Sequence, residues 1–176
     1  MSILDFAKRR QSCRKYDFNR IVEEEKIKSI LDVARLAPSA VNGQPYHITV
    51  CTGQAAIDVR QATMILGKNK FASHVPIFLV ISNDKRLDKV RLGSIVMGND
   101  FRSIDIGILA AYITAAATEE GLGTCIMGQF DPYKVKKACG TNLRPRLVIA
   151  LGYPQEGYPI RNKKRKSIEE LVSKKD

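Results

Sequence analysis

The hydrophobic positions of the chain switch repeatedly between a helical and an extended spacing. In residues 22–38, VEEEKIKSILDVARLAP, apolar side chains recur every three or four positions and Pro38 closes the segment, which predicts a helix with one buried face. The stretch YHITVCT at 46–52 instead alternates apolar and polar side chains, as a strand with one buried face does. Residues 55–66, AAIDVRQATMIL, return to the helical spacing.

The second half of the chain carries the most apolar segments. PIFLVIS at 76–82 is continuously apolar, which indicates a central strand covered on both faces. IDIGILAAYITAAAT at 104–118 has Asp105 as its one charge and is shorter than the roughly 20 residues of a membrane span. We therefore predict a helix buried on nearly every side, suited to a domain centre or a subunit interface.

Four shorter elements complete the pattern, and the run 85–100 shows no clear preference. Asp131 is placed to cap the start of one helix, and Ser167 with Glu170 has the spacing of a capping box. The predicted elements are the strand GLGTCIMG (121–128), the helix DPYKVKKACG (131–140), the strand RLVIALG (146–152) and the terminal helix SIEELV (167–172). About four strands among five or six helices predict an α/β or α+β sandwich.

The chain reads as one domain over residues 1–176 with a basic tail at 161–176. Its 176 residues, 44% of them hydrophobic, can fill one core, and no repeat or linker divides them. The N-terminus lacks the apolar core of a signal peptide. The four cysteines are far apart in sequence and form no CxxC pair, so we expect reduced thiols in a cytoplasmic protein and no metal site.

The balance of charges points to an anionic partner. The chain has 29 basic and 18 acidic side chains, a net charge of +11, which suits nucleic acid, a membrane surface or a phosphorylated small molecule. The segment KRRQSCRKY at 8–16 packs five cations into nine positions, as a solvated surface, a nucleic-acid patch or a socket for one compact anion would. The tail RNKKRK at 161–166 lacks the interleaved aromatic residues that stack on nucleic-acid bases.

Several familiar catalytic motifs are absent from the sequence. There is no GxSxG elbow, no complete phosphate-binding P-loop and no GxGxxG fingerprint. The two histidines are far apart in sequence, and no paired-carboxylate motif supports hydrolysis. If the protein is an enzyme, a bound cofactor is expected to carry the reaction.

Four separated stretches, taken together and in this order, carry a family resemblance. They are RRQSCRKY, APSAVNGQPYHITV, GLGTCIMGQF and NKKRKSIEELV. The series resembles the flavin-dependent nitroreductase family over nearly the whole chain. The resemblance implies an α+β domain with a central mixed or antiparallel sheet sandwiched by helices. It also implies an intertwined homodimer with two FMN molecules at the subunit interface and NADH or NADPH as electron donor.

The resemblance also assigns cofactor contacts to positions of this sequence. The family's motifs fall on Arg10, Gln11, Ser12, Arg14, Pro38, Ser39, Ala40, Asn42, Gln44, Met127, Gly128, Lys163 and Arg165. Several cations with a hydroxyl among them suit the terminal phosphate of FMN. Arg14 is implied to stabilise the reduced ring near its N1 and C2 oxygen. Gly123 and Gly128 either leave room for the ring or serve as turn residues.

The activity implied is ping-pong hydride transfer from NAD(P)H through the flavin to an electron-poor acceptor such as a nitroaromatic or a quinone. No residue is then needed as a catalytic base, because the flavin carries the chemistry. The larger family members often have an acidic residue at the position of Met127, so here a main-chain amide would serve the ring edge. The alternative is a flavin-binding or basic nucleic-acid-binding protein without turnover, although nucleic acid is the less favoured partner.

Overall fold

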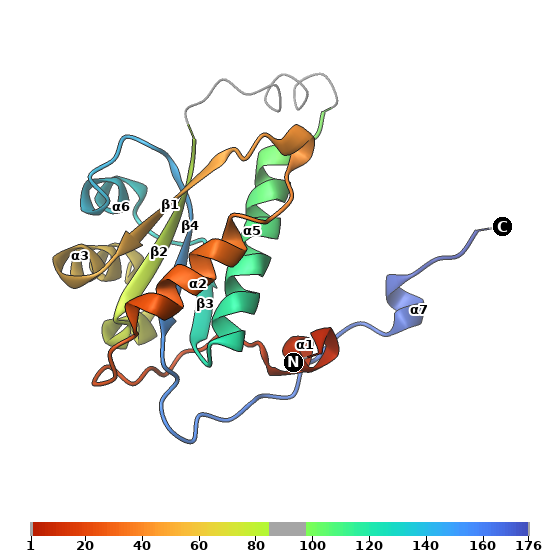
Figure 1. Cartoon of the computed structure of the whole chain (residues 1–176), viewed down its shortest axis with the longest axis horizontal. Coiled ribbons are helices and arrows are strands. Elements are labelled where there is room, and N and C mark those ends of the chain that lie inside the picture. Colours follow the sequence, from red (N-terminus) through yellow and green to blue (C-terminus); the bar gives the residue numbers. More distant parts are fainter. Residues whose placement is uncertain (1, 85–97, 176) are drawn as a thin grey trace.

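The computed structural model describes residues 2–84 and 98–175 and has a single antiparallel sheet with helices on both faces (Figure 1). The strands are β1 (Tyr46–Cys51), β2 (Ile77–Asn83), β3 (Gly123–Met127) and β4 (Pro145–Gly152), in the spatial order β1-β2-β4-β3. Every neighbouring pair is antiparallel. The predicted α+β class is therefore confirmed with an antiparallel sheet. Residues 85–97 of the unassigned run lie outside the described residues.

Among the described residues, two helices pack on each face of the sheet, as Figure 1 shows. One layer consists of α2 (Glu24–Ala34) and α5 (Phe101–Glu119), and the other of α3 (Gly53–Thr63) and α6 (Pro132–Ala138). The remaining short elements are α1 (Ile3–Arg9), η1 (Ala40–Asn42), η2 (Lys70–His74) and α7 (Ile168–Leu171). All predicted strands and helices are present. Helix α1 was not predicted, and none of its residues is buried.

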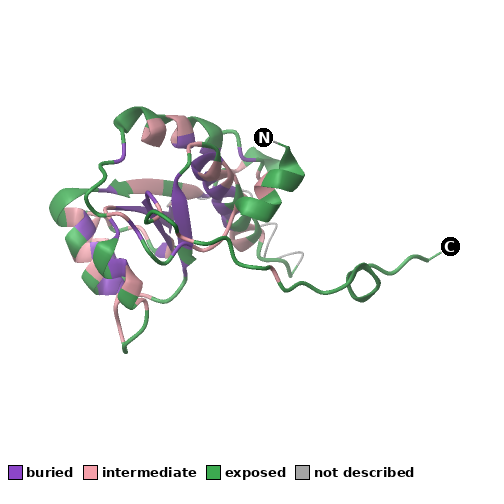
Figure 2. Ribbon diagram, turned by 90° about the horizontal axis from the view of Figure 1, so that it is seen from below, coloured by how far each residue is buried: buried purple, intermediate pink, exposed green. Residues whose placement is uncertain are grey.

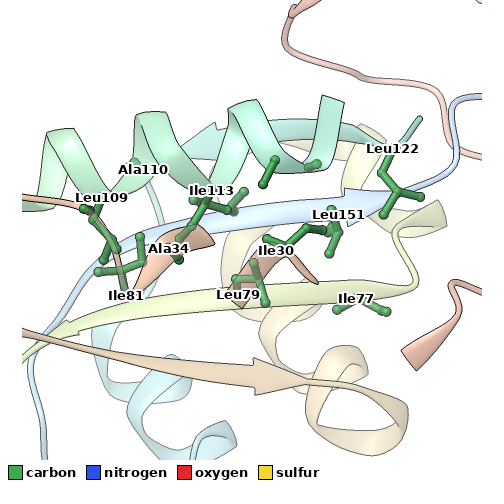
Figure 3. Packing of buried hydrophobic residues seen from close by; sticks show 14 of the residues in the cluster. Ile30, Ala34, Ile77, Leu79, Ile81, Leu109, Ala110, Ile113, Leu122 and Leu151 are labelled. Atoms are coloured by element: carbon green, nitrogen blue, oxygen red, sulfur yellow. The ribbon is translucent and has the colours of Figure 1, made fainter. Parts of the chain in front are cut away.

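The alternating side chains of β2 form the centre of two separate cores. Leu79 and Ile81 face α2 and α5, where they pack with residues such as Ile30 (Figure 3). Phe78 and Val80 point to the other face and pack toward α3 and α6. Residues of both sets are completely buried. This pattern confirms the prediction of a central strand covered on both faces.

Helix α5 is buried on one side and open on the other. Asp100 caps its start, since the Oδ1 atom accepts a hydrogen bond of 3.1 Å from Ser103 N, so the helix begins earlier than predicted. Ile104 is 47% exposed, and Gly107 and Ala111 are also exposed on the same open side. The prediction of burial on nearly every side is thus wrong for the single chain. By length and composition α5 could cross a membrane, but its inner face is part of the core.

The chain ends in an extended tail that leaves the body of the protein (Figure 2). Its helix α7 has no buried residue. The predicted capping box is present, because Ser167 Oγ accepts from Glu170 N at 3.2 Å and Glu170 Oε2 accepts from Ser167 N at 2.9 Å. This short helix is therefore held by local hydrogen bonds and not by packing on the same chain.

Candidate functional site: a cation cluster between the two termini

The N-terminal segment 10–17 and the C-terminal segment 153–163 run beside each other along the end of the sheet. Cys13 N donates to Thr124 O at 2.8 Å, which joins the first segment to β3. Asp17 N donates to Tyr153 O at 2.9 Å, and further backbone contacts continue along the pair. Residues about 150 positions apart in the sequence are thereby neighbours.

Gln11 joins the two segments through both ends of its side-chain amide. Its Nε2 atom donates to Pro159 O at 2.9 Å, and its Oε1 atom accepts from Arg161 N and Arg161 Nε, both at 3.1 Å. Arg161 also donates to Ser12 O. Because these partners satisfy the Gln11 amide within the protein, the residue orders the segment. Arg161 was not among the predicted site residues, although it belongs to the basic run of the tail.

Four cations gather where the segments meet: Arg10, Arg161, Lys163 and Arg165, called here the terminal cation cluster. Lys163 Nζ donates to Arg10 O at 2.6 Å. Burial lowers the pKa of Lys163, and the charges of Arg10, Arg165 and Arg161 lower it further. Within the described part of the chain no carboxylate is ion-paired with any of the four. Mutual repulsion without neutralisation is the electrostatic signature of a site for a compact anion.

Ser12 and Arg14 extend the cluster toward β3. Arg14 N donates to Tyr158 Oη at 3.2 Å, while its side chain is exposed. Burial raises the pKa of the Cys125 thiol, and this effect outweighs the lowering by Arg14 and by a hydrogen bond with Ser12. Cys125 therefore has the character of a packed thiol and not of a nucleophile.

The loop after α2 holds an unusual backbone conformation. Val41, Asn42 and Gln44 have φ of 47°, 52° and 44°, in the left-handed region that residues other than glycine rarely adopt. Ser39 Oγ accepts from Gln44 N at 3.0 Å, and Gln44 Nε2 donates to Asn42 Oδ1 at 3.1 Å. Such conformations cluster at ligand-binding positions because the surrounding structure must hold them in place. Pro38 and Asn42 are exposed beside this turn.

A buried carboxylate on α5 anchors this loop. Asp105 is 2% exposed, and its Oδ1 atom accepts a hydrogen bond of 3.1 Å from Ala40 N. Its Oδ2 atom is buried and has no hydrogen-bond partner among the described residues. The one charged residue of the apolar segment 104–118 thus has a structural role, because Asp105 ties the loop to the start of α5.

The structure does not bring the loop and the terminal cation cluster together in one chain. The loop touches Asp105 near the start of α5, whereas Arg10 shares a cavity with Thr118 near its end. Thirteen residues of helix at 1.5 Å each separate these points by about 20 Å. Figure 1 shows η1 and α1 at opposite ends of α5. The predicted site residues therefore form two separate groups in the chain.

The two predicted site residues at the end of β3 differ in burial. Met127 is 4% exposed and packs in the core on the side of α3 and α6. Gly128 is exposed, and a Cβ atom there would have open space within 4 Å. Gly123 is different, because a Cβ atom would lie 2.8 Å from Cys13 Cβ. The reason for glycine at 123 is thus the close approach of the N-terminal segment.

The fold and the sequence both resemble those of known proteins. The protein is an α+β sandwich with an antiparallel sheet. It has a loop with positive φ angles after α2 and a cation cluster between its two termini. The sequence model of the Nitroreductase family matches residues 7–70 and 56–153, which is well over half of the chain. The chain belongs to the nitroreductase family.

Individual relatives agree with this assignment. The NADH dehydrogenase of Thermus thermophilus is 28% identical over 180 residues, covering 87% of each chain. The crystal structure of a nitroreductase family protein from Clostridium difficile 630 has a TM-score of 0.80 and 28% identity, covering 98% of each chain. The FMN-dependent nitroreductase of Clostridium difficile R20291 has a TM-score of 0.73 and 26% identity, covering 96% of this chain and 94% of that chain.

Proposed function

We propose that the protein is an FMN-dependent oxidoreductase that accepts reducing equivalents from NADH or NADPH and passes them to an electron-poor acceptor such as a nitroaromatic or a quinone. The terminal cation cluster is the single observation that carries the proposal, since it fits the phosphate of FMN. The family membership supports it, as do the names of the similar FMN-dependent nitroreductase and NADH dehydrogenase.

The residues present fit the phosphate end of this cofactor. Arg10, Lys163 and Arg165 can hold the two negative charges, and the Ser12 hydroxyl can bond a phosphate or ribityl oxygen. Arg161 is fixed by Gln11 and Ser12, so it adds a positioned charge. Lys163 and Arg165 donate to carbonyl oxygens, which carry no net charge. A bound phosphate would therefore reduce the repulsion among the cations of the cluster.

The ring end is supplied by the exposed Arg14, the end of β3 and the loop after α2. When bound, FMN supplies the hydride-transfer chemistry in two half-reactions of two electrons each. Arg14 would stabilise negative charge on the reduced ring. The Met127 main chain and Gly128 leave space beside it, because the Met127 side chain is turned into the core. Ser39, Asn42 and Gln44 would shape the opposite wall.

The site is completed in a homodimer. The two groups of site residues lie about 20 Å apart along α5 in one chain, so the loop of one protomer would meet the cation cluster of its partner. The open side of α5 with Ile104, Gly107 and Ala111 is the surface that a second copy would cover. The tail 161–176 would reach across the partner, because its apolar side chains Ile168, Leu171 and Val172 are at least half exposed.

The place of action proposed is the cytoplasm. All four cysteines are free thiols, and Cys13, Cys51 and Cys125 are buried. Free thiols are the rule in the reducing compartment of the cell, where structural disulfides are rare. NADH and NADPH are also cytoplasmic electron donors, which agrees with the proposed activity.

Anaerobic reduction of the bound flavin tests the activity. The purified protein is loaded with FMN, and its visible absorbance is followed while NADH or NADPH is added without oxygen. We expect the flavin bands to bleach and then to return when a quinone or nitroaromatic is added in molar excess. A protein that binds FMN but does not bleach with either nucleotide would be a passive flavin carrier, and the proposed activity would be rejected.

A further inference from the structure

Two cysteines that are far apart in the sequence meet on the face of the sheet opposite α5. Cys51 is the last residue of β1, and Cys139 follows the last turn of α6. Their Sγ atoms are 3.8 Å apart, although 88 positions separate them in the sequence. No CxxC spacing announces such a pair, so only the packing of α6 against the sheet reveals it.

The geometry of the two elements fixes the pair in place. Thr49 and Cys51 lie two positions apart on β1 and therefore point to the same face of the sheet. Cys51 is 1% exposed and belongs to the core between the sheet and the helices α3 and α6. Cys139 is only partly buried, and Gly140 with φ of 58° turns the chain away immediately after it. Cys51 is thus the enclosed residue of the pair and Cys139 the more exposed one.

The two thiols are also chemically unequal. The hydrogen bond with Cys51 lowers the pKa of Cys139, and a second one with Thr49 lowers it further against the opposing effect of burial. The pKa of Cys51 is raised by the same hydrogen bond and by burial. Together with the greater exposure of Cys139, these directions favour Cys139 as the attacking sulfur of the pair. By contrast, burial raises the pKa of both Cys13 and Cys125.

We propose that Cys51 and Cys139 form a peroxide-reactive dithiol site, separate from the FMN site, that closes reversibly to a disulfide. The Cys139 thiolate attacks the O–O bond of a hydroperoxide and becomes a sulfenic acid, and the released alkoxide or hydroxide takes up a proton. The Cys51 thiol then attacks the sulfenic sulfur, so that the S–S bond forms and water leaves. The two sulfurs lose two electrons and the peroxide gains them.

The closure needs only a small local movement. A disulfide has an S–S distance of about 2.0 Å, so the two side chains must approach each other by under about 2 Å. The bond would tie the edge strand β1 to α6 and close a loop of 88 positions. In a reducing compartment such a bond is transient and reopens with a dithiol reductant.

Peptide mass spectrometry after mild oxidation tests this site. The FMN-loaded protein, with its flavin oxidised and no nucleotide present, is treated with a small molar excess of hydrogen peroxide, and the remaining thiols are alkylated. We expect a linked peptide pair containing Cys51 and Cys139, lighter by two hydrogens, while Cys13 and Cys125 remain as alkylated thiols. Treatment with dithiothreitol should restore four free thiols.

Two serine variants separate the roles of the sulfurs. Cys51→Ser should leave a sulfenic acid on Cys139 that dimedone captures, whereas Cys139→Ser should leave Cys51 unoxidised under the same treatment. Both variants should bind FMN and bleach with the nucleotide as the unchanged protein does, which makes this result independent of the proposed function. Absence of the linked peptide, a linked Cys13–Cys125 pair, or faster oxidation of Cys51 than of Cys139 would overturn the proposal.

Discussion

The pKa of Lys163 is lowered both by burial and by the positive charges of neighbouring arginines. Its ammonium group lies among three arginines and donates to one carbonyl oxygen, Arg10 O, at 2.6 Å. Lys163→Met should weaken FMN binding roughly tenfold or more, because a charge-assisted hydrogen bond to phosphate is lost. Flavin fluorescence titration measures the change. Lys164→Met is the matched control, since the neighbouring Lys164 is exposed and adds nothing to the lowered pKa of Lys163.

The lowered pKa of Lys163 predicts a pH dependence. Bound phosphate favours the charged ammonium, whereas the free protein loses this proton below the ordinary value of 10.5. The affinity for FMN should therefore fall as the pH rises through the lowered pKa, because binding must then take up a proton. Lys163→Arg should shift this fall to higher pH, since a guanidinium keeps its charge. Equal pH profiles for both proteins would contradict the role given to Lys163.

Single residues of the site could be predicted only in part from the sequence. The basic and hydroxyl groups Arg10, Ser12, Lys163 and Arg165 lie in recognisable runs, and the structure gathers them at one place. The clamp of Gln11 on Arg161 was missed because a hydrogen bond over 150 positions leaves no local pattern. The positive φ angles of the loop after α2 were equally hidden, since residues other than glycine occupy those positions.

At the level of elements, two glycines of the third strand region should behave in opposite ways. In Gly123→Ala the new Cβ would lie 2.8 Å from Cys13 Cβ and 2.9 Å from Cys13 Sγ, so the N-terminal segment must move. We expect a loss of about 1–3 kcal/mol in the free energy of unfolding, typical of overpacking. Chemical denaturation measures this loss. An unchanged stability would show that the segment does not depend on this close approach.

Gly128→Ala separates the cofactor from the fold. No described residue would lie within 4 Å of a Cβ atom at this position, so the stability should stay unchanged. If the ring of FMN lies beside Gly128, the methyl group should still weaken FMN binding. Titration with FMN after a denaturation control checks both statements. Equal FMN affinity in this variant would place the ring elsewhere.

The regular elements were largely predictable because burial imposes a period on the sequence. The continuous apolar run of β2 and the helical spacing of α2 correspond directly to their places in the core. The open side of α5 was mispredicted, because composition reports how apolar a helix is and not which surface covers it. The contact between β1 and α6 at Cys51 and Cys139 was invisible, since it arises from tertiary packing alone.

For the whole molecule, the proposed FMN site needs residues from two protomers. Ala111→Glu puts a carboxylate on the open side of α5, where a second copy would bury it without a partner. We expect this variant to sediment as a monomer at micromolar concentration and to bind FMN at least tenfold more weakly. Ile57 lies on α3 in the other helix layer and is 38% exposed, so Ile57→Glu should leave both properties unchanged. A dimeric Ala111→Glu protein, or a monomer with full FMN affinity, would contradict the shared site.

Whether the terminal cation cluster holds the phosphate of FMN is tested most directly by comparing FMN with riboflavin, which has the same ring and lacks the phosphate. Calorimetric titration of the purified, flavin-free protein should show FMN binding roughly 100-fold or more tightly than riboflavin, because several cations of the terminal cluster meet the phosphate. The difference should shrink on raising the salt concentration. Equal affinities for the two flavins, or no binding of either, would show that the cations of the two chain ends do not hold this cofactor.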